Sequence, residues 1–175
     1  MNIPTMRGLF LQAGEKAIDI ITPEMSTSLK MYNKKGYAIL GLNPFVEVSE
    51  SQFSIEDLLN FTNIAEKNEH IVYCQNRDDW APDRNYLLFA TAKSLLANRE
   101  HKNTLTIVNE YTHLLRPGDC LYGGGVFDGF AIAVSGFSEK IDEKFATQLA
   151  QQIRIEYANL FHQYMKINHT NSAFV

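Results

Sequence analysis

Apolar residues recur at three- and four-residue steps along the first segment of the chain. This spacing predicts an amphipathic helix over residues 6–21. Pro23 ends or kinks that helix, because proline lacks the N–H that a helix needs and its ring clashes with the preceding turn. A second helix is predicted over residues 24–33, since Lys34-Lys35-Gly36 is typical of a helix end.

The rest of the chain alternates between apolar runs and helical patterns. Short apolar runs predict strands, and three- and four-residue spacing predicts helices. The expected strands are residues 37–42, 70–75, 105–108 and 130–134, and the expected helices are residues 54–67, 82–98 and a long one after Ser138. This order favours an α+β or α/β layered domain over a helix bundle or a β-sandwich.

Composition narrows the class of protein. A chain of 175 residues predicts one domain. Its net charge of −4 argues against a general nucleic-acid or membrane-surface binder, which needs a basic face. No apolar run reaches the ~20 residues of a membrane span, and the first 22 residues lack the pattern of a secretory leader. Two cysteines without such a leader predict reduced thiols in the cytoplasm.

Three consecutive glycines, Gly123, Gly124 and Gly125, stand between a turn and the last predicted strand. They do not form a nucleotide-binding loop, because no lysine follows them and the next element is a strand. Glycine permits positive φ angles and the close approach of another group. Two interpretations remain open, a ligand-binding loop and the corner of a hairpin at a sheet edge. Tyr122, beside the run, is a candidate ligand contact on the first interpretation.

Other candidate groups are more dispersed. Arg77, Asp79 and Trp80 form a charged turn whose tryptophan and arginine are residue types that often line contact sites. The histidines and cysteines show no zinc spacing, and His70 and His113 are the weak candidates for a metal ligand.

Cys120 is expected to be more exposed than Cys74, which lies in an apolar strand. Near the start of the last helix, Ser138 is expected to cap the helix and Asp142 and Glu143 to favour its dipole.

Two segments together resemble the GlcG- and HbpS-like proteins, a family of heme-degrading or heme-binding-like domains. The first segment is residues 77–97, with matches at Arg77, Asp79 and Ala92-Lys93. The second is the more specific, and its matches are Gly123-Gly124-Gly125, Asp128-Gly129, Val134-Ser135-Gly136 and Asp142-Glu143. The family joins two strands by a tight turn before the first segment, whereas a predicted helix separates residues 37–42 from 70–75 here.

The resemblance implies a profilin-like α+β fold, in which helices flank an antiparallel sheet in three layers. It implies a single domain over residues 1–175, with residues 1–50 forming a helical N-terminal extension. It also implies assembly into homo-oligomers, and heme or a related tetrapyrrole is the ligand it suggests. A likeness of fold does not by itself establish a function.

Three functions are therefore compared. The first is a small-ligand binding protein, with heme among the candidate ligands and a pocket between the glycine run and the Arg77–Trp80 turn. The second is a non-enzymatic, homo-oligomeric scaffold. The third is an enzyme acting through Cys120 or Asp79, for which the sequence shows no positioned catalytic partner. We expect the first, with the second as the alternative.

Overall fold

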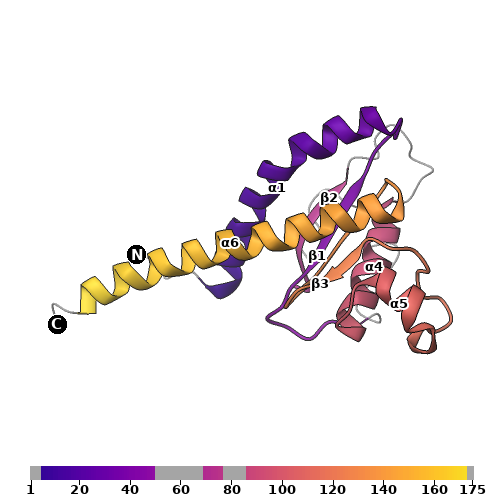
Figure 1. Cartoon of the computed structure of the whole chain (residues 1–175). Coiled ribbons are helices and arrows are strands. Elements are labelled where there is room, and N and C mark those ends of the chain that lie inside the picture. The colour runs from indigo at the N-terminus through magenta and orange to yellow at the C-terminus, as the bar shows by residue number, and fades with distance from the viewer. Residues whose placement is uncertain (1–4, 50–68, 77–85, 173–175) are drawn as a thin grey trace.

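The computed structural model describes residues 5–49, 69–76 and 86–172, with side chains to residue 167. Within these residues the chain forms four α-helices, one short 3-10 helix and four strands (Figure 1). In chain order the elements are α1 (Met6–Met31), β1 (Ala38–Leu42), β2 (Ile71–Asn76), α4 (Tyr86–Glu100), α5 (Thr104–Glu110), η2 (Thr112–Leu114), β3 (Gly125–Phe127), β4 (Ala131–Ser135) and α6 (Glu139–Ser172). The helix predicted over residues 54–67 lies outside the described residues.

The four strands form one antiparallel sheet in the order β2-β1-β4-β3. In the middle of the sheet, Leu40 of β1 lies opposite Cys74 of β2 on one side and Ala133 of β4 on the other. Three of the four predicted strands are confirmed as β1, β2 and β4. The interior pair, β1 and β4, joins segments that are about 90 residues apart, so the sheet depends on long-range contacts.

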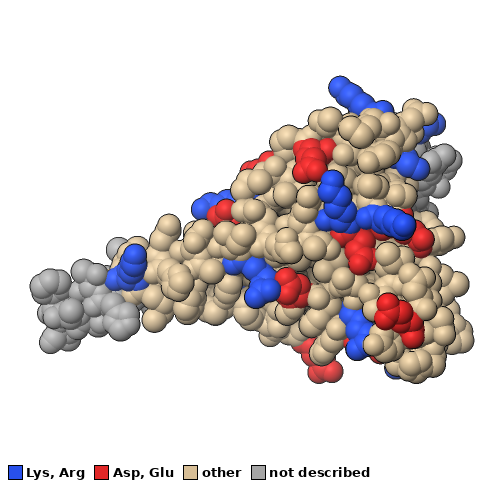
Figure 2. All heavy atoms as spheres, in the orientation of Figure 1, with Lys and Arg blue, Asp and Glu red and all other residues tan. Residues whose placement is uncertain are grey.

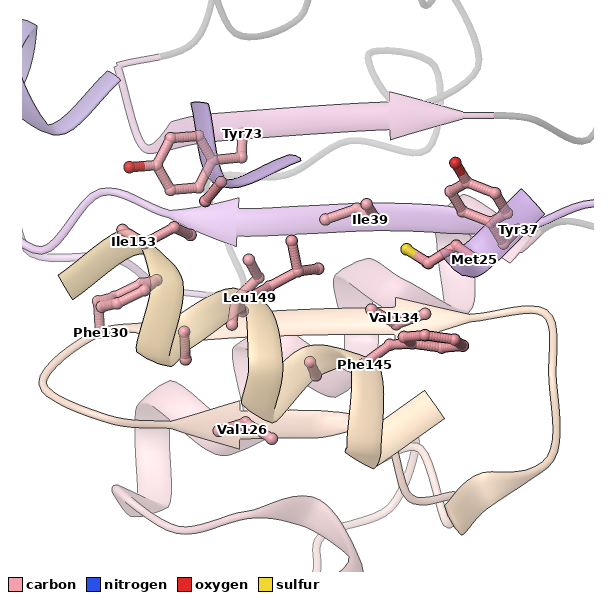
Figure 3. Close-up of a cluster of buried hydrophobic side chains, with 14 of the residues drawn as sticks. Met25, Tyr37, Ile39, Tyr73, Val126, Phe130, Val134, Phe145, Leu149 and Ile153 are labelled. Carbon is pink, nitrogen blue, oxygen red and sulfur yellow. The ribbon is translucent and has the colours of Figure 1, made fainter. Parts of the chain in front are cut away.

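Helices cover both faces of this sheet. Alternate residues of a strand point to opposite faces, and Ile39 packs with α1 and α6 whereas Leu40 packs with α4. Figure 3 shows Phe145, Leu149 and Ile153 of α6 on the first face, against side chains from the strands. The structure thus confirms an α+β fold with an antiparallel sheet between two helical layers.

Helix α1 runs from Met6 to Met31 with Pro23 inside it, so the prediction of a separate helix over residues 24–33 is wrong and Pro23 does not end the first helix. Proline leaves one carbonyl of the preceding turn without its helical donor. Around it, the Thr22 hydroxyl donates to the Ile18 carbonyl at 2.6 Å, and burial of Met25 and Leu29 holds the second half of the helix on the core. Tertiary packing therefore overrides the local break.

The strand predicted at residues 105–108 is also wrong, because this segment belongs to helix α5. Its β-branched residues favour a strand by propensity, but Thr104 and Ile107 are buried at a helical spacing of three residues. The Thr104 hydroxyl also accepts a hydrogen bond from the Gly125 N–H at 2.9 Å, and Asn103 Oδ1 accepts one from the Phe127 N–H at 3.1 Å. These bonds fix the start of α5 against the edge strand β3.

Candidate functional site

A pocket of about 260 Å³ lies where the carboxyl end of β4 meets the first turn of α6. Helix α4 supplies one wall and the segment before β3 supplies another. Lys34, which follows α1, lies at the rim. The described residues that line the pocket are Lys34, Tyr86, Phe89, Lys93, Tyr122, Ser135, Gly136, Phe137, Glu139 and Asp142. The fold thus brings four separate segments of the chain to one site.

A buried ion pair forms the floor of the pocket. Lys93 Nζ lies 3.1 Å from Asp142 Oδ2, and the two side chains are only 3% and 4% exposed. Lys93 Nζ also donates to the Val134 carbonyl at 3.2 Å and to Ser135 Oγ at 3.4 Å. An ammonium group has three N–H donors, so these three acceptors occupy them all. Lys93 therefore ties α4, β4 and α6 together, and its charge is compensated within the protein.

Asp142 is held from two sides. Its Oδ1 accepts a hydrogen bond from the Phe137 N–H at 2.9 Å, while its Oδ2 faces Lys93. Burial raises the pKa of this carboxyl above its ordinary value, against the opposing effect of the Lys93 charge and the hydrogen bonds. The interpretation of Asp142 as a residue that merely favours the helix dipole is therefore incomplete, because its main partner is a lysine on another helix.

Two glycines allow close backbone packing around the floor of the pocket, and one of them, Gly124, lies against the ion pair. Gly124 has a φ of 118°, and a Cβ atom there would stand 2.6 Å from the Val134 carbonyl oxygen and 2.7 Å from the Asp142 Cβ. Gly136 has a φ of 140°, and its Cβ would stand 2.4 Å from the Gly36 carbonyl oxygen. Positive φ and close packing both require glycine at these two positions. The glycine run thus lets β3 approach the Lys93–Asp142 pair.

Aromatic side chains form the walls above the floor. The rings of Phe89 and Tyr122 meet edge to face, with centroids 6.1 Å apart, and the two residues are 45% and 55% exposed. Phe137 is almost buried and stacks on Tyr37 at 6.0 Å. Exposed aromatic rings beside a polar floor are what a site for an organic ligand offers, since rings supply contact area at low entropic cost.

Two charged groups stand at the opening. Lys34 is exposed at the rim. Glu139, in the first turn of α6, accepts a hydrogen bond from the Gly123 N–H at 3.0 Å and so fastens the glycine run to the helix. The Ser135 hydroxyl lines the pocket and accepts from Lys93, which leaves its own proton able to donate to a ligand.

The sequence-based candidates fall into three groups. Tyr122 lines the pocket, and Gly123, Gly124 and Gly125 lie behind it in contact with residues of its floor and rim. Arg77, Asp79 and Trp80 lie outside the described residues. His70 precedes β2 and His113 lies in η2, so neither belongs to the described lining of the pocket.

The exposure of the two cysteines is the reverse of the prediction. Cys120 is buried, whereas Cys74 is the partly exposed one. Burial raises the pKa of both thiols, in the case of Cys74 to about 11. A thiol that resists ionisation is a poor nucleophile, so neither environment activates a cysteine for catalysis.

Sequence reasoning missed the floor as a unit. Lys93 enters the sequence-based account only through the family resemblance, and Asp142 enters it through the resemblance and through its place in the first turn of the last helix. No local pattern shows that the two side chains meet. A lysine within the apolar pattern of a helix is the signal that could have indicated a buried partner, because lysine is almost never fully buried unless it is paired.

Two kinds of feature are absent from the part of the chain that the structure describes. No three histidine, cysteine, aspartate or glutamate side chains lie together there in a way that could hold a metal ion. None of the described helices combines the length and apolar character that a membrane span requires. In comparisons with known proteins, no family model matches the chain and no curated protein matches it significantly.

Proposed function

We propose that this is a small-ligand binding protein, and that its ligand is a compact aromatic compound bearing a carboxylate. The observation that carries the proposal is the pocket itself, in which the exposed rings of Phe89 and Tyr122 stand above a polar floor. A volume of about 260 Å³ is just below the ~300–1,000 Å³ of pockets for drug-sized ligands, and therefore favours a smaller molecule.

Charge favours an acidic group on that ligand. The Asp142 and Lys93 charges offset each other at 3.1 Å. The first turn of α6 adds the positive end of a helix dipole, and Lys34 adds a cation at the rim. Glu139 opposes them, but its carboxylate is already hydrogen-bonded to the Gly123 N–H. The Ser135 hydroxyl supplies a donor near the floor.

Heme, the ligand suggested by the resemblance, fits this pocket poorly. The pocket is small for a tetrapyrrole, and the described residues that line it include no histidine. Four residues that carry the resemblance to GlcG- and HbpS-like proteins meet at this site: Lys93, Gly124, Ser135 and Asp142. We propose this likeness as one of architecture, with a ligand smaller than heme. Two free cysteines support a place in the cytoplasm, where thiols stay reduced.

Three probes of equal size and different charge test the ligand class: benzoate, benzamide and benzylamine, titrated by ligand-observed NMR. At about 0.4 kcal/mol per non-hydrogen atom, about nine atoms give a benzoate Kd on the order of 1 mM. Benzoate should bind most tightly, and Lys34→Gln should remove its advantage over benzamide. Lys35→Gln is the matched control, because Lys35 is exposed nearby but outside the pocket lining.

Phe89→Ala tests the aromatic wall. It should weaken benzoate at least fivefold, whereas Tyr32→Ala, which removes a ring with the same 45% exposure outside the pocket lining, should leave binding unchanged. Equal binding of all three probes, or benzoate binding that survives Phe89→Ala, would contradict the proposal. Titration with hemin is a separate experiment. A saturable shift of the Soret band that Phe89→Ala abolishes would show that the pocket binds heme rather than a small aromatic acid.

The second candidate function is a homo-oligomeric scaffold. The observation that favours it is the set of exposed apolar residues near the end of α6, including Met165 and Ile167. The two candidates are compatible, since the pocket lies at the opposite end of α6.

A further inference from the structure

The second half of α6 extends beyond the rest of the fold (Figure 1). The helix has 34 residues, which corresponds to a length of about 51 Å. Among the side chains of α6 that the structure describes, Ile153 is the last fully buried one, and Met165 and Ile167 further along are 38% and 55% exposed. Helix α1 accompanies α6 as far as Tyr157, whose ring lies 5.6 Å from that of Phe10 and whose hydroxyl meets Met6 Sδ. We define residues 157–167 as the α6 arm.

The apolar face that packs on the core continues along this arm. On the body of the protein the buried residues of α6 are spaced by three and four positions: Phe145, Ala146, Leu149, Ala150 and Ile153. The same spacing continues with Tyr157, Leu160, Phe161 and Tyr164. Residues at this spacing share one face of a helix. The arm therefore presents a continuation of the face that elsewhere packs against α1 and the sheet.

The composition of the arm is that of an interface core. Lys166 carries the only formal charge among the eleven residues of the arm, and four of these residues are tyrosine, phenylalanine or methionine. Interface cores are enriched in these types and depleted of charge. An amphipathic helix that binds an anionic membrane surface needs a basic polar face instead. In Figure 2 the visible face of the extended part of α6 is almost free of charged atoms, whereas both signs are interspersed over the body.

We propose that the α6 arm is a homodimer interface, in which the arms of two copies pack antiparallel about a twofold axis. This deepens the second candidate function and is independent of the ligand. A helix with an apolar face is covered best by a second such helix, and a twofold pair sets identical faces against each other. Antiparallel pairing places the two bodies at opposite ends, because the described strands and the helices α4 and α5 lie on the N-terminal side of the arm (Figure 1). The near absence of charge also removes repulsion between the copies.

The size of the arm limits the strength of the dimer. Aromatic side chains bury ~150–250 Å² each when fully covered, and Tyr157, Phe161 and Tyr164 are already partly buried. Leu160 is partly buried as well, so covering the exposed parts of these four residues together with Met165 and Ile167 removes at most on the order of 500 Å² per copy. A standard interface buries ~800 Å² per partner. An interface of this size is typical of weak, transient complexes, so we expect a reversible dimer rather than a permanent one.

Sedimentation velocity of the full chain from about 1 μM to about 500 μM tests the inference. The wild type should change from monomer to dimer over this range, and small-angle scattering of the dimer should show an elongated particle. Tyr164→Glu should raise the dimer Kd at least tenfold, because it places a charge within the paired faces. Asn159→Glu is the matched control, since it adds the same charge on the opposite side of the arm and should change the Kd less than threefold.

Each outcome has a distinct meaning. Both substitutions lie beyond Ile153, so circular dichroism should show an intact fold in each. A wild type that stays monomeric at the highest concentration refutes both the scaffold and this interface. A dimer that persists in Tyr164→Glu, or that Asn159→Glu disrupts equally, refutes the α6 arm as the interface and leaves oligomerisation through another surface.

Discussion

The buried Lys93–Asp142 pair gives the most demanding test of how the site is held together. Lys93→Met keeps much of the side chain's length but removes its charge and its three hydrogen bonds. It leaves Asp142, only 4% exposed, without its counter-ion. Removing one partner of a buried pair costs about 3–5 kcal/mol. We expect a loss of stability of this size near pH 8.

The loss of stability should depend on pH, because the ionisation of Asp142 decides whether the loss grows or shrinks as the pH rises. Burial already raises the pKa of this carboxyl in the folded protein, and removal of the Lys93 charge raises it further. The folded state then retains a proton at pH values where the unfolded chain has released it. Stability therefore falls as the pH rises through the folded pKa, by at most about 1.4 kcal/mol per pH unit. Lys93→Met should consequently be about 1–2 kcal/mol less harmful at pH 5 than at pH 8.

Urea unfolding at both pH values measures this effect. Lys144→Met is the matched control, since Lys144 pairs with Glu24 at 3.3 Å where the two side chains are 53% and 49% exposed. Such exposed pairs contribute about 0–1 kcal/mol. The double variant Lys93→Met with Asp142→Asn should cost less than the two single changes together, because no buried charge remains unpaired. A loss below 1 kcal/mol that is equal at both pH values would refute the reasoning.

Three further predictions concern the scaffold and the thiols. Gly14→Ala should destabilise the protein by about 3 kcal/mol or more in thermal unfolding, because a Cβ there would stand 1.7 Å from Tyr73 Cε1. Alanine favours helices, so a neutral result would contradict this packing. Thr104→Val should cost about 1–3 kcal/mol in urea unfolding, because it leaves the buried Gly125 N–H without its acceptor, and a stable variant would show that this bond does not fix α5. Cys120 should react with Ellman's reagent at pH 7.5 at least a hundredfold more slowly in the folded protein than in urea, because the thiol is buried and burial raises its pKa. Rapid labelling of the folded protein would show that the thiol is exposed.

The sequence predicts three of the four strands of the sheet, because each of the three is an apolar run that is visible locally. The short edge strand β3 at Gly125–Phe127 was not predicted. The apolar runs around Leu40, Val72 and Ile132 are each bounded by turn residues, and each became a strand. Where local preference and packing disagree, packing prevails. Residues 104–110 carry strand-forming side chains, yet the bonds of Asn103 and Thr104 to the β3 backbone hold them as a helix.

The site is less accessible to sequence reasoning, because its parts come together only in three dimensions. The glycine run indicated that something approaches the backbone closely, and the structure shows that Asp142 and Lys93 do so at Gly124. No local pattern pairs Lys93 with an aspartate 49 positions away. Likewise, the aromatic wall depends on Phe89 and Tyr122 meeting from different segments.

An amide chemical-shift titration with benzoate tests the central proposal most directly. Binding in the pocket predicts saturable shifts that centre on the amides of Tyr122, Gly136 and Phe137, which line it, and that disappear in Phe89→Ala. The absence of saturable shifts up to about 20 mM benzoate, or shifts that centre elsewhere on the fold, would contradict it.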